Sequence, residues 1–128
     1  AMFTVTVPNA AHTAGIFLQL LGSTSDNESC IACQSIVSVS RNADAAAVAG
    51  VVNFGGSSVI ATTASVIGSG EAVASMAVTT TAMSGATDAA QTFNILVQAD
   101  SATGTTIDLV AKAELLNNES TGVTIAAA

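Results

Sequence analysis

Few residues in this chain have side chains that perform chemistry. His12 is the only histidine among the 128 residues. A Ser-His-Asp site needs a histidine that a carboxylate orients, and His12 lies far in sequence from the acidic residues. We therefore predict that His12 is a solvent-exposed residue in the first turn of a helix, and that the chain is not an enzyme.

The two cysteines stand in a Cys-Ile-Ala-Cys sequence, Cys30 to Cys33, that allows three interpretations. A redox pair of this spacing needs a strand-to-helix turn, whereas these residues lead into an apolar strand. A zinc site needs four ligands, and His12 would be only the third. We favour the remaining interpretation, in which both are small buried or half-buried apolar residues, or form a local disulfide in an oxidising compartment.

The acidic residues form no recognisable site. Asp108 and Glu114 flank Lys112 in one alternating segment, and carboxylates that act in acid–base catalysis need burial. We interpret these three charges as a solvent-facing set that pairs across strands. The segment 26–28 lacks the ligand spacing of an EF-hand loop. The sequence therefore predicts no catalytic residues, no metal site and no cofactor.

The clearest structural pattern lies in Thr105–Leu116, TTIDLVAKAELL, where apolar and polar residues alternate. This is the pattern of a strand with one buried and one wet face. The turn Asp100–Gly104 is predicted to join it to the strand Gln91–Ala99 as a hairpin. The predicted inward residues are Ile107, Leu109, Ala111, Ala113 and Leu115, and the outward residues are Asp108, Val110, Lys112 and Glu114.

Other segments of similar length, separated by turns rich in Gly, Ser and Asn, also favour strands. They are residues 3–7, 30–40, 45–54, 59–63, 71–80 and 123–128. Seven or eight short strands at regular spacing predict a mainly β protein. Its expected fold is an antiparallel β-sandwich or jelly roll.

One segment, Ala10–Leu21, shows helical spacing instead. Asn9 is a suitable N-cap and Gly22 a suitable stop. The apolar residues on one face of this predicted helix are Ile16, Phe17, Leu20 and Leu21. This stripe either covers one end of the β core, which we favour, or docks onto a partner. We divide the single domain into a possible docking arm, residues 1–22, and a β-sandwich core, residues 23–128. Removal of the residues before Ser23 is expected to abolish partner binding and to leave the core folded.

The charge balance excludes several classes of partner. The formal net charge is −7, and Arg41 and Lys112 are the only Arg and Lys residues. A nucleic-acid surface needs clustered basic residues, and an anionic membrane surface is disfavoured for the same reason. No apolar run reaches the roughly 18 residues of a membrane helix, and no secretory signal is visible. We predict that the chain binds neither nucleic acid nor membranes.

Two stretches resemble small virion proteins of tailed bacteriophages. Thr4–Gly22, TVTVPNAAHTAGIFLQLLG, is similar to the start of such proteins, which often open with a Thr-Val-Thr-Val-Pro strand and an Ala-rich helix. Gln91–Leu115, QTFNILVQADSATGTTIDLVAKAEL, resembles the closing hairpin of β-sandwich domains in phage head and tail proteins. Leu109 stands where these domains often have Trp.

This resemblance implies a structural virion protein. The first function that it implies is a capsid decoration (cement) protein, a homotrimer on the capsid surface that binds the major capsid protein and bridges its subunits. The alternative is a tail or fibre module that binds a receptor or glycan, although such sites usually use Trp or Tyr and the chain has neither. On the first hypothesis the docking residues are Phe3, Val5, Val7, Ile16, Phe17, Leu20 and Leu21.

Overall fold

The computed structural model describes residues 1–24, 29–60, 73–101, 106–118 and 122–128, and these contain eight β-strands. The strands are β1 (Phe3–Val7), β2 (His12–Thr24), β3 (Ser29–Arg41), β4 (Val48–Ile60), β5 (Val73–Thr80), β6 (Gln91–Ser101), β7 (Ile107–Asn117) and β8 (Thr124–Ala127). Sheet A has the order β5-β6-β1-β8, and sheet B has the order β4-β3-β2-β7.

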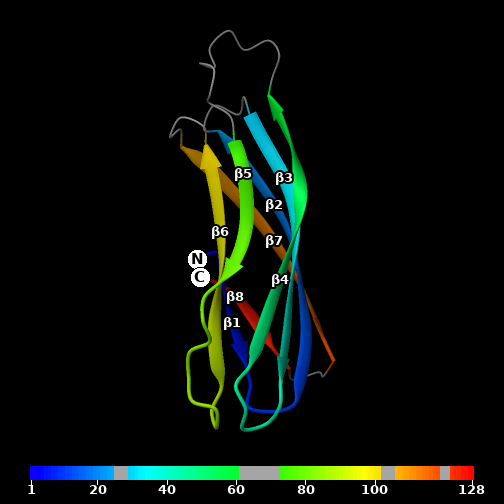
Figure 1. The fold of residues 1–128 in the computed structure, drawn as a ribbon, viewed down its shortest axis with the longest axis vertical. Helices are drawn as coiled ribbons and strands as arrows, with labels where there is room; N and C mark the ends of the chain where they lie inside the picture. Colours follow the sequence, from blue (N-terminus) through cyan, green and yellow to red (C-terminus); the bar gives the residue numbers. More distant parts are fainter. Residues whose placement is uncertain (25–28, 61–72, 102–105, 119–121) are drawn as a thin grey trace.

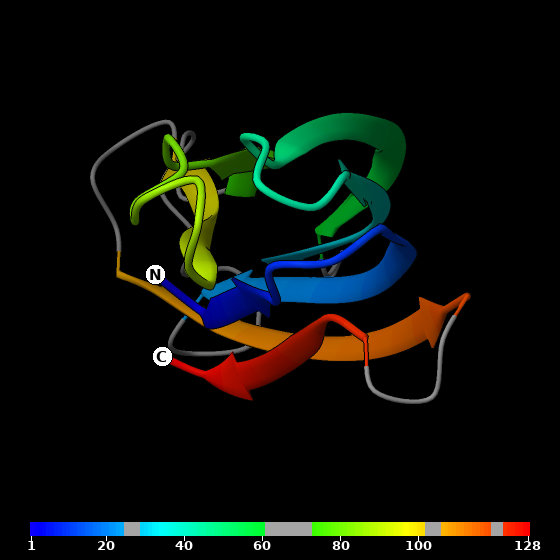
Figure 2. The same ribbon diagram turned by 90° about the horizontal axis from the view of Figure 1, so that it is seen from below.

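All paired strands are antiparallel, and the two sheets form the two layers seen in Figures 1 and 2. The predicted β-sandwich is therefore confirmed. The two chain ends lie side by side in both views, where the Ala128 N–H donates to the Met2 carbonyl at 3.0 Å.

The predicted N-terminal helix is wrong, because most of residues 10–21 belong to β2. Phe17 and Leu21 point outward and alternate with Ile16, Leu18 and Leu20, which are buried. Since β2 carries apolar residues on both faces, its sequence fits the period of a helix as well as that of a strand. The long ladders to β3 and β7 satisfy its backbone groups on both sides. Among the described residues there is no helix that could cross a membrane.

The predicted docking arm, residues 1–22, contributes an interior strand to each sheet. β1 lies between β6 and β8, and β2 lies between β3 and β7. Their inward side chains belong to the hydrophobic core, in which Val5, Val7 and Ile16 are fully buried. The segment is therefore part of the sandwich itself.

The predicted hairpin between β6 and β7 is also wrong. β6 pairs with β1 and β5 in sheet A, whereas β7 pairs with β2 in sheet B. The chain therefore passes from one sheet to the other between these strands, and residues 102–105 of the connection lie outside the described residues. Turn residues predict that the chain reverses, but they do not determine which sheet the next strand joins.

The alternating faces predicted for β7 are confirmed, and β3 and β6 alternate in the same way. Ile31, Cys33 and Val37 of β3 are buried, as are Phe93 and Ile95 of β6. The inward residues of β7 are only half-buried, because β7 is an edge strand. β4 continues through Gly55 and Gly56, where a strand end was expected, and a register shift opposite them absorbs the irregularity. Of the short strand predicted at 59–63, residues 61–63 lie outside the described residues.

One end of the sandwich is tied together by the side chain of Arg41, which is 3% exposed. Its Nε donates to the carbonyl of Ala45 at 3.0 Å, and its Nη1 donates to that of Val7 at 2.9 Å. Its Nη2 donates to the carbonyls of Thr87 and Ala89, both at 2.8 Å. Arg41 thus connects the ends of β1 and β3 with the loop that precedes β6.

One side of the sandwich is closed by Asn53 of β4, which contacts Val78 of β5 in the other sheet. The Asn53 Nδ2 donates to the Val78 carbonyl at 3.0 Å, and its Oδ1 accepts from the Val78 N–H at 2.9 Å. The same Oδ1 accepts from the Ser35 hydroxyl at 2.7 Å. The amide therefore takes the place of a backbone partner between two edge strands.

Candidate binding face on sheet B

The register pairs of sheet B place its outward side chains in rows that cross all four strands. We call the surface formed by these rows outer face B. The two central rows are Val52, Ile36, Phe17, Glu114 and Phe54, Gln34, Gln19, Lys112. The flanking rows are Gly50, Ser38, Gly15, Leu116 on one side and Ala32, Leu21, Val110 on the other.

Outer face B exposes large apolar side chains. Within the described part of the chain, every exposed large hydrophobic residue lies on this sheet and points away from the core. The exposed fractions run from 40% to 66%, for Phe17, Leu21, Val48, Val52, Phe54, Val110 and Leu116. Apolar residues gathered on one face, rather than scattered singly, are typical of an interaction surface.

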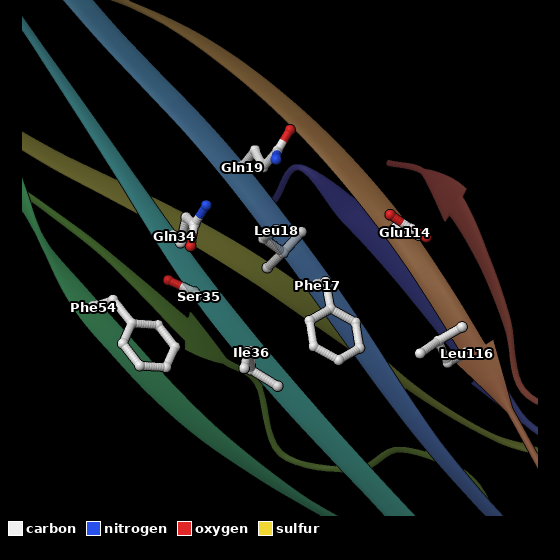
Figure 3. Close-up of a pocket in the computed structure, with 9 residues that line it drawn as sticks. All are labelled: Phe17, Leu18, Gln19, Gln34, Ser35, Ile36, Phe54, Glu114 and Leu116. Atoms are coloured by element: carbon white, nitrogen blue, oxygen red, sulfur yellow. The ribbon is translucent and has the colours of Figure 1, made fainter.

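Three of these residues and the half-buried Ile36 form a band across the sheet. Phe54, Ile36, Phe17 and Leu116 follow one another from β4 to β7 in Figure 3. They line an open depression of about 510 Å³. The remaining lining residues are Leu18, Gln19, Gln34, Ser35 and Glu114. The depression is thus an apolar strip with amide and carboxylate groups beside it, which suits another protein surface.

Gly15 makes room for the Phe17 ring on this face. A Cβ added at Gly15 would lie 3.3 Å from Cε2 of Phe17. The ring therefore covers the glycine backbone, as aromatic side chains do beside strand glycines. This contact holds Phe17 flat against the sheet and keeps outer face B shallow.

The charges of outer face B lie on the edge strand β7. Asp108, Lys112 and Glu114 are all exposed, and the register places Lys112 beside Gln19 and Glu114 beside Phe17. The other basic residue of the chain, Arg41, is buried. Lys112 is therefore the only exposed Lys or Arg side chain, and it makes this face less negative than the chain as a whole.

The outer face of sheet A has a different character. Its outward residues include Thr4 and Thr6 of β1 together with Thr92, Asn94 and Gln98 of β6. The Thr4 hydroxyl donates to the Asn94 Oδ1 at 3.0 Å. The outer face of sheet A is thus mainly polar, with Leu96 half-buried on it, whereas outer face B exposes large apolar side chains.

The structure divides the predicted docking residues into two groups. Phe17 and Leu21 are exposed on outer face B. The others lie in the core or half-buried against it, where their side chains have little or no free surface: Phe3, Val5, Val7, Ile16 and Leu20. Of the predicted docking residues, only Phe17 and Leu21 are therefore accessible to a partner, and both lie on the outward side of β2.

Sequence reasoning did not assign Ile36, Phe54 or Leu116 to a binding surface. Ile36 stands among outward serines on β3, and Val110 is an apolar residue on the otherwise charged side of β7. A single apolar residue on a polar strand face is weak evidence for a binding surface. The register of four strands brings them together, and that register is set by contacts between residues distant in sequence.

Cys30 and Cys33 carry free thiols, so the local disulfide is not formed. They lie three positions apart on β3, and alternate residues of a strand point to opposite faces. Cys33 points into the core and is buried, whereas Cys30 points outward beside Ser23. The interpretation of two buried or half-buried apolar residues is confirmed. Burial raises the pKa of the Cys33 thiol above its ordinary value of 9.0.

We expect an alkylating reagent at pH 8 to modify Cys30 well before Cys33, because the thiolate is the reactive species. Because the folded state favours the neutral Cys33 thiol, burial of this group carries no ionisation cost below pH 9. As the pH rises above 9, the free energy of unfolding is expected to fall. Mass spectrometry of peptides over a time course measures both rates. Equal rates in the native protein, or recovery of a Cys30–Cys33 disulfide, would contradict this placement.

His12 is not the solvent-exposed residue that the helix predicted. It is 6% exposed, and its Nδ1 is buried without a hydrogen-bond partner. The cause is the alternation of β2, whose inward set begins at His12. The described ranges contain no group of three or more His, Cys, Asp or Glu side chains arranged to hold a metal ion.

Comparison of the chain with family models, curated proteins and solved structures finds no match.

Proposed function

We propose that this chain is a structural virion protein, a capsid decoration (cement) protein that binds the outside of a phage head and stabilises it by bridging capsid subunits. Outer face B carries the proposal, because it gathers the exposed large apolar residues of the described chain on one sheet face. Covering such a face removes apolar surface from water, which favours assembly. The partner that we propose for the assembled protein is the major capsid protein.

Sequence likeness supports the phage assignment through residues alone. In the first resembling stretch a strand replaces the helix, and in the second a sheet-to-sheet connection replaces the hairpin. This chain and the phage virion proteins that it resembles still share the residue pattern of these two stretches and the β-sandwich class. We further propose that the sandwich is a variant of the jelly roll, since the early strands β1 and β2 lie beside the late strands β8 and β7. The tail-fibre alternative stays a prediction without a specific contact to favour it.

The proposal is tested by binding to expanded heads of the phage that encodes the chain. The double substitution of Phe17 and Phe54 by Ser should weaken head binding about tenfold to a hundredfold, because each ring is roughly half exposed and would be covered by protein in the assembled particle. Cosedimentation with heads measures the affinity, and the melting temperature of the heads reports the stabilisation.

The matched control is Leu96→Ser, which removes a half-buried outward leucine from sheet A. It should bind heads as the natural chain does, once circular dichroism has shown that both variants are folded. Failure of the natural chain to bind heads would remove the virion assignment. Equal binding by the double Ser variant would remove outer face B from the mechanism.

A further inference from the structure

Building on the proposed function, in which outer face B is covered in the working particle, we propose that its occupant is a second copy of this chain. The two sheets B would pack face to face about a two-fold axis. This axis crosses the strands midway between the two central rows. Bridging needs more than one capsid-contacting surface, and a two-fold pair supplies two equal ones.

The charge pattern determines where the axis lies. A rotation about this axis brings each position of one central row over the other central row of the second copy, on the same strand. Lys112 then faces Glu114 of the second copy, and Glu114 faces Lys112 of the second copy. An axis through either row would instead place Glu114 over Glu114 or Lys112 over Lys112. An axis along the strands would place both charges over the apolar strand β4. Only the midway axis pairs opposite charges, and it pairs them twice.

The same axis matches apolar residues with apolar residues. Leu116 and Val110 lie on β7 in the two flanking rows, and the rotation places one over the other. Val52 and Phe54 lie on β4 in the two central rows and face each other in the same way. On β2, Phe17 faces Gln19, which leaves the amide beside an aromatic ring. On β3, Ile36 likewise faces Gln34. The axis thus matches opposite charges on β7 and apolar residues on β4 and in the flanking rows of β7, and it sets apolar side chains against amides on β2 and β3.

The size of the face is also suitable. With strands about 4.8 Å apart and residues about 3.4 Å apart, the four strands over the positions Thr13–Ser23 cover roughly 700 Å². A stable interface buries about 800 Å² on each partner. Sheets in sandwiches pack face to face about 10 Å apart at about −30°, so partners on the inner strands β2 and β3 stay nearly opposite each other. Lys112 and Glu114 lie on the edge strand β7 and would meet with an offset along the strand.

Electrostatics favours this face for self-association over the others. The chain carries a net charge of −7, so two copies repel each other in most orientations. Outer face B holds the only exposed Lys or Arg side chain and the carboxylate that it would pair with. The resemblance to decoration proteins implies a trimer, whereas this charge pattern points to a pair.

A charge-exchange series tests the pairing. Lys112→Glu and Glu114→Lys should each weaken association by at least about tenfold, because each places like charges together twice. The double variant K112E/E114K restores opposite charges and should associate within about threefold of the natural chain. Asp100→Lys, on the outer face of sheet A, changes the net charge as much as Glu114→Lys does and should leave association unchanged.

Sedimentation equilibrium of the folded natural chain and variants measures the association constant. We expect the natural chain to reach twice its 12.5 kDa mass at micromolar concentration. A natural chain that is monomeric at about 100 μM, a trimer, or a double variant as weak as either single one would overturn the proposal. Head binding is measured separately. Dimers that bind no heads would remove the virion assignment alone, and monomers that bind heads would remove the two-fold pair alone.

Discussion

Removal of residues 1–22 is expected to prevent the chain from folding. The deletion takes away β1 and most of β2, the interior strands of the two sheets. The buried large side chains that are lost are Val5, Val7, Ile16, Leu18 and Leu20, none more than 4% exposed. Each contributes about 1.5–3 kcal/mol when fully buried, so the loss is comparable with the whole net stability of a domain, about 5–15 kcal/mol.

The backbone makes the loss more severe. β3 and β7 would each lose the strand beside them in sheet B, and β6 and β8 would lose theirs in sheet A. Far-UV circular dichroism and thermal unfolding measure the result, which should be a chain with no cooperative transition. Phe17→Ser is the control, because it changes an exposed side chain of the same segment and should cost at most about 1–2 kcal/mol. A cooperative transition in the truncated chain would instead restore the separable arm that the sequence predicted.

Substitution of Arg41 by Met is expected to destabilise the fold by about 3–5 kcal/mol. Methionine fills similar space, but it leaves the carbonyls of Val7, Ala45, Thr87 and Ala89 without the donors they now have. A buried acceptor that loses its partner costs about 1–3 kcal/mol, and water can reach some of these groups after the substitution. The end of the sandwich where three chain segments meet should therefore loosen first.

Denaturant unfolding of Arg41→Met and Arg41→Lys distinguishes the fork of the guanidinium from its charge. Lysine keeps the positive charge but presents donors on a single nitrogen, so it cannot reach all the carbonyls that the three guanidinium nitrogens of Arg41 contact. We expect Arg41→Lys to recover less than half of the lost free energy of unfolding. Full recovery by lysine would show that charge matters more than the four hydrogen bonds. A loss below about 1 kcal/mol in Arg41→Met would contradict the structural role of this residue.

The sequence predicts those strands well whose outward face is polar. β3 and β7 alternate cleanly, because water on one side and core on the other impose the period of two. The same alternation is absent from β2, because Phe17 and Leu21 are apolar and point outward, and this segment was wrongly predicted as a helix. The misassignment and the proposed binding face have the same physical origin, which is that β2 carries apolar residues on its outward side.

Other features depend on pairings between residues far apart in the chain. A turn before β7 is visible in the sequence, but the sheet that β7 joins is determined by its ladder with β2. In the sequence, Arg41 simply follows the predicted strand at residues 30–40. Only the fold brings the carbonyls of β1 and of the loop before β6 to its guanidinium group. Outer face B likewise exists only once four strands have taken their register. Local patterns carry none of this information.

The most direct measurement is a cryo-EM reconstruction of the particle that carries this chain, at a resolution that shows side chains. We expect Phe17, Ile36 and Phe54 to be covered by protein, with Lys112 within ion-pair distance of Glu114 of a second copy. Outer face B open to solvent in the assembled particle, or covered by capsid protein with no second copy against it, would contradict the account.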